Sequence, residues 1–186
     1  MSSSLRSLQQ VAPPPAVPLE TGTPADWSRA EAEIGLPLPA DYRELLQAYG
    51  SGCFRRFLWP LNPVGGDETL RMAKQAPRLL RKLADEQHRN PTAIPFPLHP
   101  APGGLLPWAW TERGDTLGWL TDGDPARWPV VVAYGSGGTA ERFDRTATAF
   151  LFSWLSGLIA PRLAPTTPDD GADGPFLSIE ELRRGR

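Results

Sequence analysis

The tetrapeptide Tyr-Gly-Ser-Gly occurs at residues 49–52 and again at 134–137, and each copy holds residue types that could do chemistry. A serine nucleophile on an elbow turn needs glycine two positions before it and two positions after it. Tyrosine occupies the upstream position in both copies. A phosphate-binding Walker loop needs a lysine directly after a glycine, and neither Lys74 nor Lys82 follows one. The glycines of 135–138 could form an anion nest, but both copies are predicted to be backbone turns.

Metal and acid–base chemistry have few candidate side chains. The only histidines, His88 and His99, lie in different segments without zinc-ligand spacing, and Cys53 is the single cysteine. The sequence therefore predicts no metal site and no cofactor. Four aspartates of the strand-rich region could form a catalytic carboxylate pair, although turn aspartates more often bond local backbone: Asp115, Asp122, Asp124 and Asp144. A hydrolase is the least favoured hypothesis.

Tryptophan is abundant, with seven residues in 186. Trp108 and Trp110 would share one face of a strand, with Trp119 and Trp128 on neighbouring segments. Four such rings could form a core layer, which is favoured, or an exposed recognition surface. The second interpretation gives a candidate protein-binding patch of aromatic, acidic and arginine side chains: Trp108, Trp110, Asp115, Asp122, Asp124 and Arg127.

Charge and hydropathy exclude several classes of partner. Nineteen Lys or Arg against 21 Asp or Glu give a net charge of −2, which does not favour nucleic-acid binding. Residues 1–20 lack the apolar core of a signal peptide, and no apolar run is long enough for a membrane helix. The single cysteine suits a reducing compartment. We expect a cytoplasmic protein with no membrane partner.

Two segments differ in composition from the rest. Residues 1–22 are rich in Ser and Pro, which predicts a flexible leader, and 160–175 have the Pro, Thr, Asp and Gly content of a linker. The folded domain is therefore predicted over 23–160. The segment 161–186 is predicted to be the linker and a short C-terminal helix that begins with a capping box at 178–181.

The domain is predicted to contain several helices. Thr23 and Asp26 form a capping box for one that ends at Gly35, and Pro39 begins a second that Gly50 ends. Asp67 can cap a third, which Pro77 should kink or split. The last begins after Thr146. The second helix buries a stripe of apolar side chains at helical spacing: Tyr42, Leu45, Leu46 and Tyr49.

Strands are predicted at 53–59, 105–111, 115–122, 127–135 and 141–144. The turn sequence Asp-Gly-Asp-Pro at 122–125 connects two of them as an antiparallel hairpin. The first Tyr-Gly-Ser-Gly copy thus ends a helix and the second follows a strand, so they are not an internal repeat.

A set of residues near the start of the domain is spaced like a family signature: Trp27, Glu31, Ile34-Gly35, Leu38-Pro39, Asp41-Tyr42, Leu45-Leu46 and Tyr49-Gly50-Ser51-Gly52. Together they resemble the opening of the SUKH superfamily, which includes the Smi/Knr-type fungal cell-wall regulators and many bacterial immunity proteins. The similarity continues in LLPWAWTERGDTLGWLTDGDP, VVVAYGSG and FLFSWLSG, and so spans about 27–157.

The resemblance implies a single α+β domain with a central, largely antiparallel sheet packed by helices, no catalytic residues and a binding role. The leading hypothesis is an immunity protein that neutralises a cognate bacterial toxin by direct contact, with no small-molecule substrate. The alternative is a regulatory scaffold of the fungal type, in which the leader and tail would do more of the binding. Residues 67–90 and 91–107 do not match the family pattern, so partner specificity could lie there.

Overall fold

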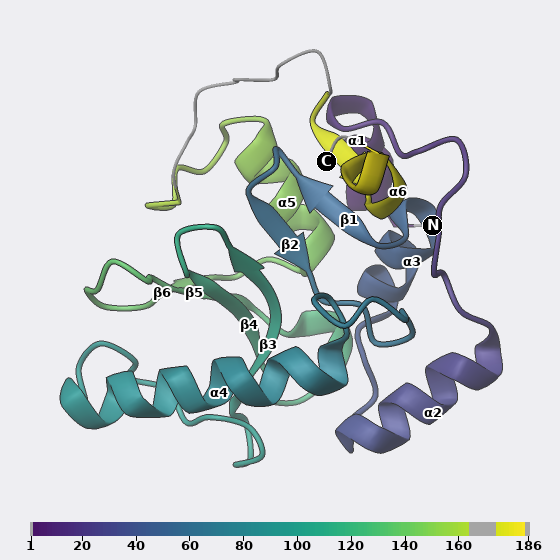
Figure 1. Ribbon diagram of the computed structural model, residues 1–186. Helices are drawn as coiled ribbons and strands as arrows, with labels where there is room; N and C mark the ends of the chain where they lie inside the picture. Colours follow the sequence, from purple (N-terminus) through teal and green to yellow (C-terminus); the bar gives the residue numbers. More distant parts are fainter. Residues whose placement is uncertain (1, 164–173, 185–186) are drawn as a thin grey trace.

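A computed structural model describes residues 2–163 and 174–184 of the chain. Its elements, in chain order, are α1 Ser3–Val11, α2 Pro24–Ile34, α3 Ala40–Tyr49, β1 Gly52–Phe54, β2 Leu58–Pro60, α4 Met72–Arg89, β3 Leu105–Thr111, β4 Thr116–Leu120, the 3₁₀ turn η1 Pro125–Arg127, β5 Val130–Ala133, β6 Glu141–Phe143, α5 Ala147–Leu155, β7 Phe176–Ser178 and α6 Ile179–Arg184 (Figure 1).

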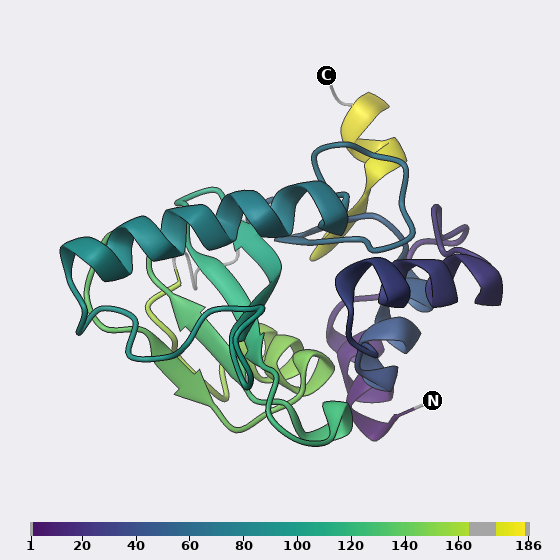
Figure 2. The ribbon, with the colours of Figure 1, turned by 90° about the horizontal axis from the view of Figure 1, so that it is seen from below.

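The strands form one sheet in the order β6-β5-β4-β3-β2-β1-β7, and every neighbouring pair is antiparallel. Helix α4 lies across one face, and α3 and α5 cover the other (Figure 2). The larger core joins α1, α3 and α5 to the sheet, and a smaller one joins Leu83 of α4 to Val131 of β5. The predicted α+β domain with an antiparallel sheet is confirmed.

The predicted capping residues of α2 and α3 are confirmed. Thr23 Oγ1 accepts a hydrogen bond from Asp26 N at 3.3 Å, and Asp26 Oδ2 accepts one from Thr23 N at 2.9 Å. Gly35 ends α2 at φ 81°, and Gly50 ends α3 at φ 67°. At Gly50 a Cβ atom would lie 2.1 Å from the Leu19 carbonyl oxygen. Both the positive φ and this close approach therefore require glycine at position 50.

The N-terminal segment is ordered, which corrects the prediction of a flexible leader over 1–22. Ser2 caps α1, and Leu5, Leu8 and Ala12 are buried in the larger core. Tyr49 donates a hydrogen bond from its hydroxyl to the Ala12 carbonyl at 2.6 Å. The spacing of the two leucines and Ala12 by three and four residues places all three on one helix face, and this amphipathic signal outweighs the Ser-rich composition.

Helix α4 differs from its prediction at both the start and the proline. It begins at Met72 and not at the predicted cap, Asp67. The Asp67 carboxylate instead accepts hydrogen bonds from Thr69 within a turn and forms an ion pair with Arg183. The helix continues through Pro77 and ends at Arg89 (Figure 1). Pro77 is exposed in the second turn, where the missing N–H costs a single intrahelical hydrogen bond.

A β-bulge in β3 changes which faces the tryptophans occupy. The register of β3 with β4 shifts between Pro107 and Ala109. Trp108 stacks on Trp119, whereas Trp110 pairs with Thr116, three positions from Trp119 and therefore on the opposite face. The prediction that Trp108 and Trp110 share a face is wrong, because a bulge adds one residue to the alternation.

The C-terminal residues return to the sheet. Strand β7 pairs with β1 at the sheet edge, with Cys53 opposite Leu177. The predicted capping box is present, since Glu181 N donates to Ser178 Oγ and Ser178 N donates to Glu181 Oε2. The linker prediction over 164–173 lies outside the described residues.

Candidate functional site

The six residues of the predicted binding patch lie in different places. Trp108 is fully buried and Asp115 is 3 % exposed, so neither can reach a partner, and their assignment to the patch is corrected. Trp110 is partly exposed on the sheet face opposite Trp108. Asp124 is exposed, but its carboxylate accepts a hydrogen bond from Ala126 N and caps η1. Only Asp122 and Arg127 line one hollow together.

Asp115 holds the first glycine after Tyr134. Gly135 N donates to Asp115 Oδ1 at 2.8 Å, and Thr111 Oγ1 donates to Asp115 Oδ2 at 2.6 Å. A Cβ atom on Gly135 would lie 2.5 Å from the Arg113 carbonyl oxygen. The second Tyr-Gly-Ser-Gly turn therefore does bind an anion through its backbone, and the anion is a carboxylate of the same chain.

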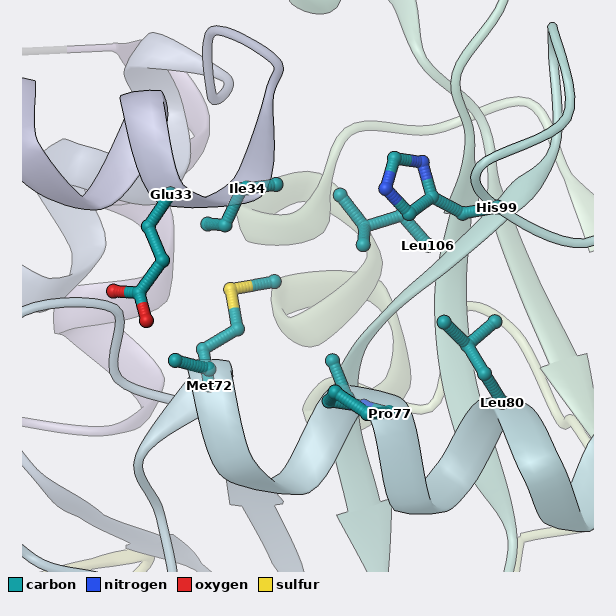
Figure 3. Close-up of a pocket in the computed structure, with 9 residues that line it drawn as sticks. Glu33, Ile34, Met72, Pro77, Leu80, His99 and Leu106 are labelled. Carbon is teal, nitrogen blue, oxygen red and sulfur yellow. The ribbon is translucent and has the colours of Figure 1, made fainter.

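A second hollow lies between the end of α2, the first half of α4 and the connector before β3. Its volume is about 290 Å³. Figure 3 shows side chains from all three segments pointing into it, with the His99 ring on one side and Glu33 on the other. We call it the His99 pocket and define it by these residues: Glu33, Ile34, Met72, Pro77, Leu80, His99 and Leu106.

Helix geometry brings the pocket residues together. Met72, Pro77 and Leu80 recur on one side of α4. Gly35 ends α2 immediately after Ile34 and lets the chain turn away there. Most of the lining is apolar, so the pocket can bury an aliphatic or aromatic group, while Glu33 offers an exposed carboxylate at its rim.

His99 contributes a titratable imidazole to the pocket. Burial lowers the pKa of its imidazole, and a hydrogen bond with the backbone of Ile34 opposes this only in part. The ring is therefore neutral at pH 7 and can offer one donor and one acceptor. The described residues contain no group of three His, Cys, Asp or Glu side chains that could hold a metal ion.

The outward face of α4 is strongly basic. The helix carries five Lys or Arg against two Asp or Glu, in a chain whose net charge is −2. Lys74 pairs with Glu68, and Lys82 donates to the Gly114 carbonyl. Arg78 and Arg81 are exposed, and no carboxylate of the described residues lies within ion-pair distance of either. Their charge is available to a partner.

The fold and this surface define a class of protein, an α+β domain with one antiparallel sheet and an apolar pocket beside a basic helix. The SUKH_6 family model, described as SMI1-KNR4 cell-wall, matches residues 24–151. That range is more than half of the chain, and the chain belongs to this family and to the SUKH superfamily. Neither the curated proteins nor the solved structures gave a match.

The sequence singled out Ile34, Pro77 and His99 for other reasons, and no pattern grouped them into one pocket. Met72, Pro77, Leu80 and His99 lie in 67–90 and 91–107, the segments that do not match the family pattern and in which partner specificity could lie. A signal was present in α4, where apolar side chains follow one face and arginines the other. His99 carried no such signal, since only the fold brings the connector against α2.

None of the helices in 2–163 and 174–184 is long and apolar enough to cross a membrane.

Proposed function

We propose that this protein is a non-catalytic, cytoplasmic protein-binding domain, and that it is an immunity protein that neutralises a cognate bacterial toxin by direct contact. Membership of the SUKH superfamily supports the binding role. The proposal depends on two features of α4. One side of the helix lines the His99 pocket, and the helix also carries Arg78 and Arg81, which have no ion-pair partner among the described residues. Pockets for small ligands usually have volumes of about 300–1,000 Å³, so about 290 Å³ suits a single anchoring side chain better than a cofactor.

The charge of α4 indicates the chemistry of the partner surface. Interfaces combine a buried anchor with charges that complement those of the partner. Arg78 and Arg81 are positioned to meet carboxylates, and the neutral His99 ring can hydrogen-bond within the pocket. We therefore expect a toxin domain that presents one protruding apolar side chain to the pocket and an acidic surface to the outward face of α4.

The first experiment is a pull-down of the tagged protein from its native cell, with the bound proteins identified by mass and the complex sized. One dominant partner at fixed stoichiometry is expected, and its toxic domain should stop growth unless this protein is co-expressed. Many weak partners, or none, would contradict the immunity proposal. They would favour the alternative, a regulatory scaffold of the fungal type.

Charge reversal tests the α4 surface. With that partner, the double variant R78E/R81E should slow association by about tenfold or more, because opposite charges steer encounter. The matched control is R6E/R145E, which makes the same change in net charge at two exposed arginines on α1 and after β6. Equal association rates for the two double variants would show that the partner binds elsewhere.

Truncation of the N-terminal segment does not distinguish the immunity function from the scaffold function. Leu5 and Leu8 are part of the core, so a deletion of 1–22 would perturb folding as well as any binding by that segment. Point substitutions on the surface are therefore the informative variants.

A further inference from the structure

Two tryptophans on neighbouring strands form a partly exposed pair beside α6. Trp59 of β2 is the ladder partner of Trp110 of β3. Their ring centroids are 5.6 Å apart and the ring planes differ by 9°. Both side chains are partly exposed, unlike Trp108 and Trp119, which are fully buried. Trp110 packs against the larger core with part of its surface and leaves the rest exposed, and tryptophan is among the residues most often found at binding hot spots.

A hollow of about 360 Å³ lies beside the pair, and we call it the tryptophan pocket. Ile179 and Leu182 of α6 form part of its wall. Glu112 Oε1 accepts a hydrogen bond from the Trp59 indole N–H at 2.7 Å, which fixes the carboxylate at the edge of the ring. No Lys, Arg or His of the described residues lies within ion-pair distance of Glu112.

The pocket already holds one guanidinium of the same chain. Arg183 Nη2 lies 2.9 Å from Asp67 Oδ2, and both residues line the hollow. Although burial works against it, hydrogen bonds from Thr69 and Arg183 hold the pKa of Asp67 below its ordinary value. Asp67 and Arg183 therefore neutralise each other, and among the described residues that line the pocket Glu112 is the carboxylate without a cationic partner.

We propose that the tryptophan pocket binds an arginine side chain of a partner protein. A planar guanidinium can stack on the exposed indole rings, whose faces attract cations. Its N–H groups can then donate to the carboxylate oxygen of Glu112 that Trp59 does not use. Lysine offers the charge without the plane, and citrulline offers the plane without the charge. The tryptophan pocket shares no lining residue with the His99 pocket, and the proposal does not depend on the partner proposed above.

The test is a titration of the ¹⁵N-labelled full-length chain with the peptide acetyl-Gly-Arg-Gly-amide, followed through the indole N–H signals. We expect saturable shifts of the Trp59 and Trp110 signals, with those of the buried Trp27 and Trp154 unchanged. E112Q keeps an acceptor for Trp59 but removes the charge, and should weaken binding by about threefold to fivefold. The matched control is E33Q, an exposed carboxylate of the His99 pocket, which should leave the affinity unchanged.

Three further probes decide the chemistry of the ligand. Equal binding of the citrulline peptide would overturn the proposal, because charge would then play no part. Equal binding of the lysine peptide would overturn the preference for a guanidinium. Tighter binding of free L-arginine than of the peptide would show a small-molecule site instead of a protein-docking one, and the absence of any saturable shift would remove the site altogether.

Discussion

At the scale of single residues, Tyr42 connects the family signature to the sheet. Its hydroxyl donates to the carbonyl oxygens of Leu61 at 2.5 Å and Trp108 at 3.0 Å. The ring packs edge-on against Trp119, with centroids 4.8 Å apart. Burial raises the pKa of the phenol well above its ordinary value, so the O–H donor persists at any physiological pH. Tyr42, a residue of the family signature, thus attaches α3 to β3 and to the end of β2.

Removing that hydroxyl should be costly. Y42F keeps the ring but leaves a buried carbonyl without its donor, which is expected to lower the free energy of unfolding by about 1–3 kcal/mol. Equilibrium urea denaturation of the two proteins measures the difference. An unchanged midpoint and slope would mean that the two hydrogen bonds contribute nothing net to stability.

At the scale of elements, α1 is the part of the fold that composition concealed. It packs against α5, and Ser4 Oγ lies 2.7 Å from Thr148 Oγ1 across that contact. Thr148 in turn donates to the carboxylate of Asp41 on α3. The N-terminal helix, the closing helix and the signature helix are therefore joined by one polar chain above the apolar core.

A truncation inside α1 tests whether the helix is docked. Leu8 is fully buried, so L8A is expected to destabilise the protein by about 2–5 kcal/mol through lost burial and a residual cavity. The control is V11A on the same helix, because Val11 is 37 % exposed and should change stability by less than about 0.5 kcal/mol. Equal, small effects of both substitutions would contradict a docked α1.

Local signals predicted most elements, and long-range pairing accounts for most of the errors. The capping box of Thr23 and Asp26 and the turn at Gly50 depend on neighbouring residues, so the sequence was enough to place them. The bulge after Pro107 shifts the pairing of β3 with β4. A proline inside a strand is typical of a bulge or an edge, and the predicted alternation of Trp108 and Trp110 did not take this signal into account. In contrast, β7 becomes a strand only because β1 offers an unpaired edge.

The binding surfaces were harder to predict than the fold for the same reason. Trp110 was a candidate from its type alone, but its neighbour Trp59 comes from another strand, and the tertiary fold makes them a pair. His99 meets Ile34 across 65 positions of sequence that include two helices and two strands. Asp115 was a candidate for a catalytic carboxylate pair, but in the structure its carboxylate accepts a hydrogen bond from Gly135 N and stabilises a turn.

At the scale of the whole molecule, stability should depend on pH through His99. An unfolded histidine binds a proton near pH 6.5, whereas burial lowers the pKa of His99 in the folded protein. Between those two pKa values the unfolded state binds more protons than the native state, so the free energy of unfolding falls as pH decreases. The contribution is complete above pH 6.5 and is lost as pH falls toward the folded pKa.

The measurement is the free energy of urea unfolding at several pH values between 7.5 and 5.5, for the wild type, H99N and a matched H88N control at the exposed end of α4. We expect the decline toward pH 5.5 to be smaller in H99N than in H88N, because only the first substitution removes the buried imidazole. A steeper decline in H99N would mean that the charged form of His99 is favoured by the fold. In that case the pocket would carry a positive charge in acid and could not offer the neutral, apolar site that the proposed anchor requires.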